Sequence, residues 1–240
     1  MQTKRPFVVS IAGFDPSAGA GVLADVKTFE QHGVYGFGIC SALTVQNDSE
    51  FFHVQWLSAA QIIEQLQTLT KKFTIAACKI GIIGSLDILQ AVTHFLRQHN
   101  PRMYIVWDPV LKASAGYAFH ESIVAQQLST ILRSIDLITP NYDEWQRFSN
   151  LAISSAMLLK GGHRPHALGV DTLYERDDAI VIEPGVENVF PKHGSGCVLS
   201  AAITAQLAKG DALPDACRAA KRYIESFLNS NETLLGYHVR

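Results

Sequence analysis

The sequence has no excess of basic residues and no long apolar run. Its 240 residues include 20 lysines and arginines against 22 aspartates and glutamates, which gives a formal net charge of −2. Because surfaces that bind nucleic acid usually carry a basic patch or stripe, this balance argues against a nucleic-acid partner. No segment approaches the ~20 apolar residues that a membrane helix needs, and residues 1–6 are too polar to begin a secretory signal. We therefore expect no membrane association and a cytoplasmic location.

Cysteines are few and scattered. The chain has four, and none belongs to a CxxC pair: Cys40, Cys78, Cys197 and Cys217. Without a secretion signal, such cysteines are expected to be reduced thiols, as in cytosolic proteins. Linkers, low-complexity segments and internal repeats are also absent from the sequence, and 48% of the residues are hydrophobic. A chain of this length can bury one sizeable core, so we predict a single domain over residues 1–240.

Short apolar runs alternate with segments of helical spacing along most of the chain. Strands are predicted at 7–12, 38–45, 75–83, 104–107, 135–139 and 157–159. Helices are predicted at 21–32, 58–73, 85–100, 121–133, 196–209 and 214–229. The runs 172–175 and 179–183 flank a polar turn, which indicates an antiparallel hairpin. This order predicts an α/β fold with a mostly parallel central sheet, helices on both faces and the hairpin at one edge.

Polar residues follow several of the predicted strands. In folds of this class the ligand lies outside the carboxyl ends of the strands, where Asp108, Asn141 and Lys160 are expected. Asp108, followed by Pro109, can hold a magnesium ion directly or through water. Asn141 and Glu144 can add oxygen ligands, or they can serve as a turn residue and a helix cap. Lys160 is placed to neutralise nucleotide phosphates, unless it is only a surface lysine.

The strongest local signal is the run His193-Gly194-Ser195-Gly196-Cys197, which leads into a predicted helix. Glycines let the backbone turn so that consecutive N–H groups point at one spot, and the helix adds the positive end of its dipole. Together they form an anion hole suited to a phosphoryl group in transfer. The same field is expected to lower the pKa of the Cys197 thiol, which could then act as a base. The alternative is a plain glycine turn before a core helix with a buried cysteine.

A second glycine turn, Gly19-Ala20-Gly21, opens the first predicted helix. Its spacing superficially matches the dinucleotide-binding fingerprint, but residues 14–18 separate it from the preceding strand, whereas that fingerprint needs a tight strand-to-helix turn. A turn that shapes a pocket for a small substrate fits better. Asp25 lies one helical turn beyond Gly21 and is near enough to face that pocket. The alternative is a solvated aspartate on an exposed helix face.

A series of motifs across nearly the whole chain carries a family resemblance. In chain order they are AGFDPSAGAG (12–21), ADVKTF (24–29), TVQN (44–47), KIG (79–81), DPV (108–110), ITPN (138–141), LKGGH (159–163) and HGSGC (193–197). With these motifs the sequence resembles the hydroxymethylpyrimidine/phosphomethylpyrimidine kinases, the thiamin-pathway members of the ribokinase superfamily. The resemblance implies a three-layer ribokinase-like α/β fold and a homodimer. It also implies ATP- and Mg²⁺-dependent phosphorylation of 4-amino-5-hydroxymethyl-2-methylpyrimidine and/or its monophosphate, in thiamin biosynthesis or salvage.

The resemblance also implies roles for single residues. The expected substrate-binding residues are Gly13, Asp25, Gln46, Ile82 and Val110. The expected ATP-binding residues are Lys160, Asp108 and Asn141, and the expected magnesium residues are Asp108 and Glu144. The expected catalytic anion hole consists of Gly194, Ser195, Gly196 and Cys197, with the cysteine where most ribokinase relatives carry an aspartate base. Gln46 favours the aminopyrimidine, because a side-chain amide can both donate and accept on that edge of the ring.

One departure from the family lies on the nucleotide side. Only residues 145–159 separate Glu144 from Lys160, where the family usually has room for an extra helix and strand lead-in. A parallel crossover with its helix takes at least ~10–12 residues, so the connection is feasible but tight. We expect Trp145 and Phe148, spaced i, i+3, to pack one short helical turn onto the sheet. We also expect weaker ATP binding with the chemistry kept.

Two further departures from the family are lysines. Lys192 stands where a threonine is common, and Lys112 stands in a loop where apolar or small residues are more usual.

Three other functions remain open. A pyridoxal or pyridoxine kinase would also act on a ring with a hydroxymethyl arm. A non-catalytic pyrimidine-binding protein with the kinase fold would suit the short connection, although it would not need Asp108, Lys160 and Cys197 together. A dinucleotide oxidoreductase is the third alternative.

Overall fold

The fold was analysed on a computed structural model, which describes residues 5–110, 125–148, 153–162, 164 and 167–239. Within these residues nine strands form one sheet in the order β3-β2-β1-β4-β5-β6-β7-β8-β9. The parallel part consists of β1 (Phe7–Phe14), β2 (Tyr35–Gln46), β4 (Ile75–Ile80), β5 (Tyr104–Trp107), β6 (Leu137–Ile138) and β7 (Ala156–Leu159). Their carboxyl ends therefore lie at one edge of the sheet, as the strand pattern predicted.

Antiparallel strands close both sides of the sheet. The predicted hairpin is confirmed as β8 (Asp171–Glu175) and β9 (Asp178–Ile182), and β8 pairs antiparallel with β7. On the other side β3 (Phe51–Trp56) pairs antiparallel with β2. The sequence analysis missed β3, because much of this edge strand is exposed and its apolar pattern is weak. The turn before it is closed by Asn47, whose side-chain oxygen accepts the backbone N–H groups of Ser49 and Glu50.

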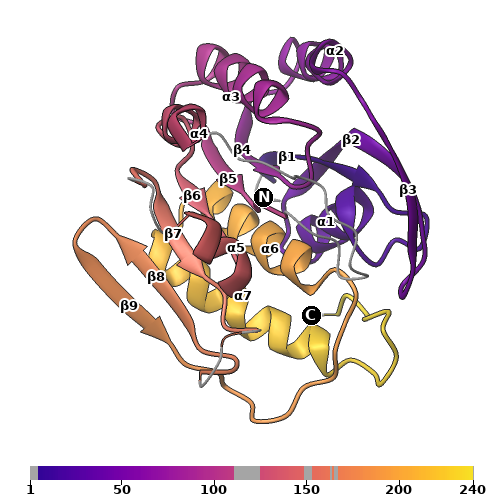
Figure 1. Cartoon of the computed structure of the whole chain (residues 1–240), viewed down its shortest axis with the longest axis vertical. Helices are drawn as coiled ribbons and strands as arrows, with labels where there is room; N and C mark the ends of the chain where they lie inside the picture. The colour runs from indigo at the N-terminus through magenta and orange to yellow at the C-terminus, as the bar shows by residue number, and fades with distance from the viewer. Residues whose placement is uncertain (1–4, 111–124, 149–152, 163, 165–166, 240) are drawn as a thin grey trace.

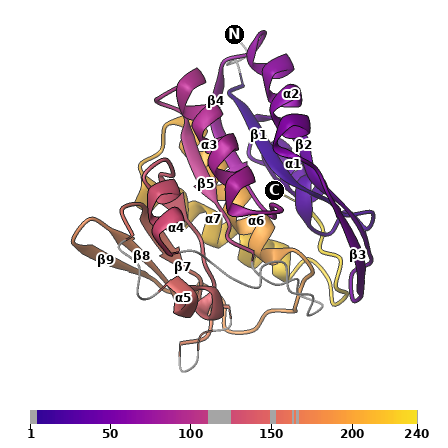
Figure 2. The ribbon, with the colours of Figure 1, turned by 45° about the horizontal axis from the view of Figure 1, so that its top comes forward.

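Helices cover both faces of the sheet, as expected (Figures 1 and 2). One face carries α2 (Ala59–Thr70), α3 (Leu86–His99), α4 (Ala125–Leu132) and α5 (Tyr142–Phe148). The other face carries α1 (Gly21–Gln31), α6 (Ser195–Lys209) and α7 (Leu213–Leu228). Helix α6 is apolar almost all round because it packs against the sheet, α1 and α7. This three-layer arrangement confirms the predicted fold class.

Local signals fixed several helix ends where they were expected. Ser58 and Gln61 form the reciprocal hydrogen bonds of a capping box at the start of α2. Ser85 caps α3 by accepting the Ile88 N–H, and Gly33, at φ +73°, follows the end of α1. Helix α4 is described only from residue 125, so the first residues of the helix predicted at 121–133 lie outside the described part. Among the described helices, none is long and apolar enough to cross a membrane.

The described part of the short connection after β6 contains the predicted helical turn. Trp145 and Phe148 lie on α5, and Phe148 is buried in the core with its ring centroid 6.2 Å from that of Trp107. Residues 149–152, between α5 and β7, lie outside the described part. Parallel pairing of β6 with β7 keeps Glu144 and Lys160 at the same edge of the sheet.

Candidate active site

The turn before α6 has the geometry of an anion hole. Gly194 is the N-cap of α6 at φ +74°, and a Cβ atom there would collide with the carbonyl oxygen of Gly19. The first hydrogen bond within the helix joins Val198 N–H to the Gly194 carbonyl at 3.0 Å. The N–H groups of Ser195, Gly196 and Cys197 therefore have no acceptor within the helix and are available to an anion. Only glycine fits at position 194, for both steric and conformational reasons.

Two charged side chains meet the anion hole at Gly196. A Cβ atom on Gly196 would lie 3.2 Å from Lys160 Nζ and 3.8 Å from Asp108 Oδ2. Lys160 Nζ also donates to Asp108 Oδ1 at 2.7 Å. The strand ends and the helix start thus bring together three of the predicted groups, and any side chain larger than glycine at position 196 would crowd the cation.

Asp108 is buried and held from three sides. Besides Lys160, it accepts hydrogen bonds from Thr139 Oγ1 at 3.0 Å and Ser200 Oγ at 3.3 Å. Burial by itself would lower the pKa of Lys160, but the carboxylates of Asp108 and Glu144 outweigh it and raise that pKa. The lysine is therefore a permanent cation at this edge of the sheet, as the charge of bound phosphates would require.

Asn141 and Glu144 cap α5 reciprocally. The Asn141 side-chain oxygen accepts the Glu144 N–H at 2.9 Å, and Glu144 Oε2 accepts the Asn141 N–H at 2.8 Å. This is the helix-cap alternative left open by the sequence. The Glu144 carboxylate is near Lys160, because its negative charge contributes to the raised pKa of that lysine.

A second group of predicted residues lies near the carboxyl ends of β1, β2 and β4. A Cβ atom on Gly13 would collide with the end of the Ile82 side chain and would lie 3.6 Å from Thr44 Cγ2. Thr44 Oγ1 accepts from Gln46 Nε2 at 2.8 Å and donates to the Phe14 carbonyl at 2.8 Å. Thr44, which the sequence analysis did not assign, thus fixes the rotamer of Gln46. Gly13 therefore contacts Ile82 directly, and Thr44 links it to Gln46.

Val110 and Gly21 have different neighbours: Val110 contacts the Asp108 segment, and Gly21 contacts Gly13 and Cys197. Val110 directly follows the Asp108 segment, where its N–H donates to the Asp108 carbonyl at 2.8 Å; no contact described for it reaches Gly13. Gly21, at φ +61°, lies against the Gly13 carbonyl, and its backbone hydrogen bonds to Cys197. The start of α1 therefore contacts both the Gly13 backbone and Cys197.

Asp25 is neither solvated nor open to the pocket. Its side chain is fully buried, and both carboxylate oxygens accept from Lys79 Nζ, at 2.9 and 2.8 Å. Ser10 Oγ donates to the same carboxylate. Burial alone would lower the pKa of Lys79, but Asp25 outweighs it and raises that pKa, so the lysine keeps its charge. Burial raises the pKa of the Asp25 carboxyl, and the charge of Lys79 opposes this shift. The carboxylate predicted to face the substrate is thus occupied by a buried lysine.

The thiol of Cys197 behaves differently from the sequence expectation. A lowered pKa was predicted from the helix dipole, but burial raises the pKa of Cys197, and the nearby carboxylates of Asp25 and Asp108 act in the same direction. Lys79 and the Gly21 backbone oppose this shift without overcoming it. The predicted direction was wrong because burial of this partly covered thiol and the nearby carboxylates disfavour the thiolate more than Lys79 and Gly21 favour it.

Comparisons with known proteins identify the family. A sequence profile of the family described as Phosphomethylpyrimidine kinase matches residues 15–239. The chain belongs to this family. A protein from Staphylococcus aureus (strain MRSA252) named hydroxymethylpyrimidine/phosphomethylpyrimidine kinase is 33% identical over 92% of this chain and 87% of that protein.

Solved structures of the phosphomethylpyrimidine kinase family and of a related kinase have the same fold. Phosphomethylpyrimidine kinase from Clostridium difficile 630 is 30% identical with a TM-score of 0.75, covering 92% of this chain and 98% of that one. An ADP complex of Bacillus subtilis pyridoxal kinase is 28% identical with a TM-score of 0.79, covering 93% and 92%. The ribokinase-like architecture expected from the motifs is thus confirmed.

Two ion pairs within this phosphomethylpyrimidine kinase fold were not predicted from the sequence. The first joins Asp25 and Lys79, and its one signal in the sequence was a lysine inside an otherwise apolar strand. The other pair joins His193 Nε2 and Asp15 Oδ2 at 2.8 Å, both side chains being almost fully buried. Burial alone would raise the pKa of Asp15, but the hydrogen bond with His193 and those from Ser17 and Ala20 hold it below its ordinary value. This pair joins the loop after β1 to the anion hole.

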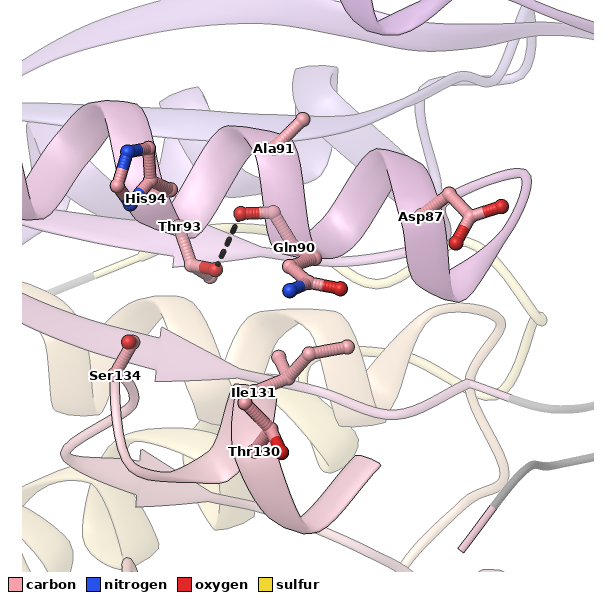
Figure 3. A pocket seen from close by; sticks show the side chains of 8 residues that line it. All are labelled: Asp87, Gln90, Ala91, Thr93, His94, Thr130, Ile131 and Ser134. Atoms are coloured by element: carbon pink, nitrogen blue, oxygen red, sulfur yellow. Dashed lines mark hydrogen bonds between the residues drawn. The ribbon is translucent and has the colours of Figure 1, made fainter. Parts of the chain in front are cut away.

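Two observations limit where ligands can bind. Among the described residues, no cluster of three or more His, Cys, Asp or Glu side chains is arranged to hold a metal ion on its own. A groove of about 490 Å³ runs between α3 and α4 (Figure 3), lined by residues that include Asp87, Gln90, His94 and Thr130. None of the predicted site residues lines it. The groove is therefore separate from the candidate active site.

Proposed function

We propose that the chain transfers the γ-phosphoryl group of ATP to the hydroxymethyl group of 4-amino-5-hydroxymethyl-2-methylpyrimidine and/or its monophosphate, in thiamin biosynthesis or salvage. The observation that carries this proposal is the meeting of Lys160, Asp108 and the anion hole at Gly196. This arrangement suits a transferring phosphoryl group, because phosphoryl transfer depends mainly on positioning and on stabilising negative charge. Family membership and the names of the relatives support the choice of reaction.

In this proposal each group has one task. The hydroxymethyl oxygen attacks the γ-phosphorus, the bond from that phosphorus to the bridging oxygen of ADP breaks, and the hydroxyl proton leaves to a base. The N–H groups of residues 194–197 stabilise the negative charge on the phosphoryl oxygens. Lys160 stabilises the charge of the ATP phosphates, and Asn141 is assigned to orient them. The small thiolate fraction of Cys197 receives the hydroxyl proton.

The contribution of Cys197 as a base is small in this proposal. Its raised pKa leaves little thiolate at neutral pH. A general base typically contributes on the order of 10²–10⁴-fold, and a mostly protonated thiol should fall at or below the low end. Positioning by the anion hole and charge stabilisation by Lys160 then supply most of the acceleration.

Magnesium is proposed to bind at Asp108 and Glu144. Mg²⁺ is usually held by one or two carboxylates, substrate phosphates and several waters, so the lack of a full protein-ligand cluster is compatible with it. Both carboxylates raise the pKa of Lys160, and this proximity to one cation supports the assignment. When bound, the ion would offset phosphate charge. Within the described residues, Asp108 now uses its oxygens for Lys160, Thr139 and Ser200, which favours contact through water.

The ring pocket is proposed to hold the pyrimidine between Gly13, Ile82 and Val110. Gln46 would pair with the amino edge of the ring, and Thr44 holds it ready by accepting from its amide. Gly13 lets the ring approach the backbone, because a side chain there would collide with Ile82. Asp25 is assigned an indirect role, as the partner of Lys79 beneath the pocket.

The function is tested with purified chain, ATP and Mg²⁺ against a panel of ring alcohols: hydroxymethylpyrimidine, its monophosphate, pyridoxine and pyridoxal. ADP release measured by a coupled assay, with ³¹P NMR of the product, should show turnover of the pyrimidines and loss of turnover in Asp108→Asn. Preferential turnover of pyridoxine or pyridoxal would favour the activity named for the Bacillus subtilis neighbour. Tight pyrimidine binding without any turnover would favour a non-catalytic binding protein.

We further propose that residues 1–240 act as one domain, in the cytoplasm and as a homodimer. All four cysteines are free thiols, which suits a reducing compartment. The edge formed by β2 and β3 exposes Leu43, Val45 and Phe52, and a second copy would cover such side chains. Light scattering after size-exclusion chromatography should give twice the chain mass, and Val45→Lys should lower it. A monomer at micromolar concentration would rule out the dimer.

A further inference from the structure

The chain does not stop at α7 but runs back to the anion hole. After α7, residues 230–239, here called the C-terminal tail, leave the end of the helix and return toward the start of α6 (Figure 1). The tail has no helix or strand of its own in the described residues, yet it is tied to three parts of the protein. None of the roles proposed above uses it.

One tail contact acts directly on the turn of the anion hole. The backbone N–H of His193 donates to the Leu234 carbonyl at 2.9 Å. The side chain of His193 lies 2.8 Å from Asp15 on the loop after β1. The residue before Gly194 is therefore held from two sides, by the tail through its backbone and by the loop through its ring.

A second tail contact lies at Gly19, in the loop that packs against Gly194. A Cβ atom on Gly19 would lie 2.8 Å from Leu235 Cδ2 and 2.6 Å from the His193 ring. Gly19 is the residue whose carbonyl meets Gly194. The leucine thus covers the loop at the point where it supports the turn.

The tail itself is anchored to two helices. Gly236 packs so closely on the Phe227 ring of α7 that a Cβ atom would lie 2.6 Å from it. The His238 ring lies 4.9 Å from the Phe227 ring. Its Nδ1 is 3.2 Å from the Tyr223 hydroxyl on α7 and 3.4 Å from Thr28 Oγ1 on α1. Because these anchors belong to the packed core, they give the tail a fixed position from which to hold the turn.

Lys192, one of the departures from the family pattern, contacts the tail. Its ammonium donates to the Asn231 carbonyl at 2.5 Å and lies 5.5 Å from the centre of the Phe190 ring. The side chain is 6% exposed. Lysine in place of the common threonine therefore ties the segment leading into the anion hole to the first part of the tail.

We propose that the C-terminal tail is a positioning segment of the anion hole, held by Lys192, Gly236 and His238 and acting through the Leu234 carbonyl on His193. This inference rests on the proposed function, because it assigns the tail to the transfer step. Loss of the tail contact would leave the His193 N–H unpaired and free the turn to shift. A shift of about 1 Å in a catalytic group can cost about 10²-fold in rate.

Two variants displace the tail without touching the anion hole, and one neighbour serves as a control. Gly236→Val pushes the tail off Phe227, and Lys192→Thr removes the tie to Asn231. Tyr237→Ala is the matched control, because its side chain is 61% exposed while its backbone N–H still donates to Ser230 Oγ. We expect kcat to fall about 10- to 100-fold in Gly236→Val and less in Lys192→Thr. KM for the ring alcohol should stay within about 3-fold, and Tyr237→Ala should match the parent.

Hydrogen exchange separates positioning from general loss of structure. The amides of residues 194–197 should exchange faster in Gly236→Val, whereas the amides of β1 should exchange as in the parent. If the turn exchanges normally, or if kcat is unchanged while the tail amides are exposed, the proposal is overturned. Should Gly236→Val fail to fold, Leu235→Ala provides the same comparison. If the parent phosphorylates no ring alcohol, the proposed function fails, and exchange at residues 194–197 still decides whether the tail holds the turn.

Discussion

The buried ion pair between Asp25 and Lys79 leads to the most quantitative prediction. Both side chains are 0% exposed, and the lysine contacts both carboxylate oxygens. Replacing Lys79 with methionine keeps a long flexible side chain of similar reach but removes the charge. Asp25 would then be a buried carboxylate with Ser10 as its remaining hydrogen-bond donor among the contacts described. Removing one partner of such a pair typically costs about 3–5 kcal/mol.

This cost is large enough to measure and small enough for the protein to survive. Domains are usually stable by about 5–15 kcal/mol. For chains of 150–250 residues, a loss of 1 kcal/mol lowers Tm by about 2–4 °C. Lys79→Met should therefore lower Tm by about 6–20 °C in differential scanning calorimetry at pH 7. Asp25→Asn should also destabilise, because it leaves the lysine charge without its counter-ion.

A double variant is the control that isolates the charge. Replacing a buried ion pair by apolar side chains of similar volume is often neutral or stabilising, so Asp25→Leu with Lys79→Met should recover most of the lost Tm. A single variant within about 2 °C of the parent, or a double variant as unstable as the sum of the singles, would refute this reasoning. The stable double variant also tests Asp25 itself: an unchanged KM for the ring substrate supports its indirect role, whereas a large rise supports direct contact.

The remaining predictions concern the ring, the base, the nucleotide and the tail. Gln46→Leu should weaken pyrimidine binding by about 1–3 kcal/mol for each ring group left unpaired, and unchanged affinity would contradict its assignment. Cys197→Ala should lower kcat at most modestly, and an unchanged kcat at saturating substrates would remove the base role while leaving the anion hole in place. The short Glu144–Lys160 connection should give a high KM for ATP with kcat kept, which grafting a family-length segment should lower; a tight KM in the natural chain would refute this. Burial and Lys27 lower the pKa of His238 to about 4, below its ordinary value of about 6.5. Because the unfolded or released tail then binds the proton more readily, tail docking should be complete above about pH 6.5 and weaken as the pH falls toward 4. Tail-amide exchange measured between pH 7 and pH 5 tests this, with His238→Phe as the variant that should lose the pH dependence.

Much of the fold was predictable because its signals are local. The capping box of Ser58 and Gln61 joins residues three apart in the chain, and the glycine after α1 needs only its own backbone conformation. The parallel character of the sheet then followed from a general rule, since alternating strands and helices make a parallel sheet whose carboxyl ends share one edge. That rule was sufficient to place Asp108, Lys160 and the anion hole together.

Strand β3 was missed and the pKa direction of Cys197 was misjudged because both depend on residues from other elements. An edge strand with exposed residues acquires its structure from its partner β2, so its own residues carry little signal. The field at a helix start is a local property that the sequence reveals. Burial of Cys197, and the carboxylates of Asp25 and Asp108 beside it, come from other elements, and they decide the direction of its pKa.

Sequence alone thus determined the class of fold, the glycine turn and the set of groups at the strand ends, because periodicity, caps and motifs act within a few residues. Tertiary structure decided which of those groups are paired and which are open. Asp25 and Lys79 lie 54 residues apart in the chain and meet only when α1 packs against the sheet. The Leu234 carbonyl reaches His193 only after α7 has docked. Such pairings depend on the relative placement of whole elements, and no spacing along the chain encodes that placement by itself.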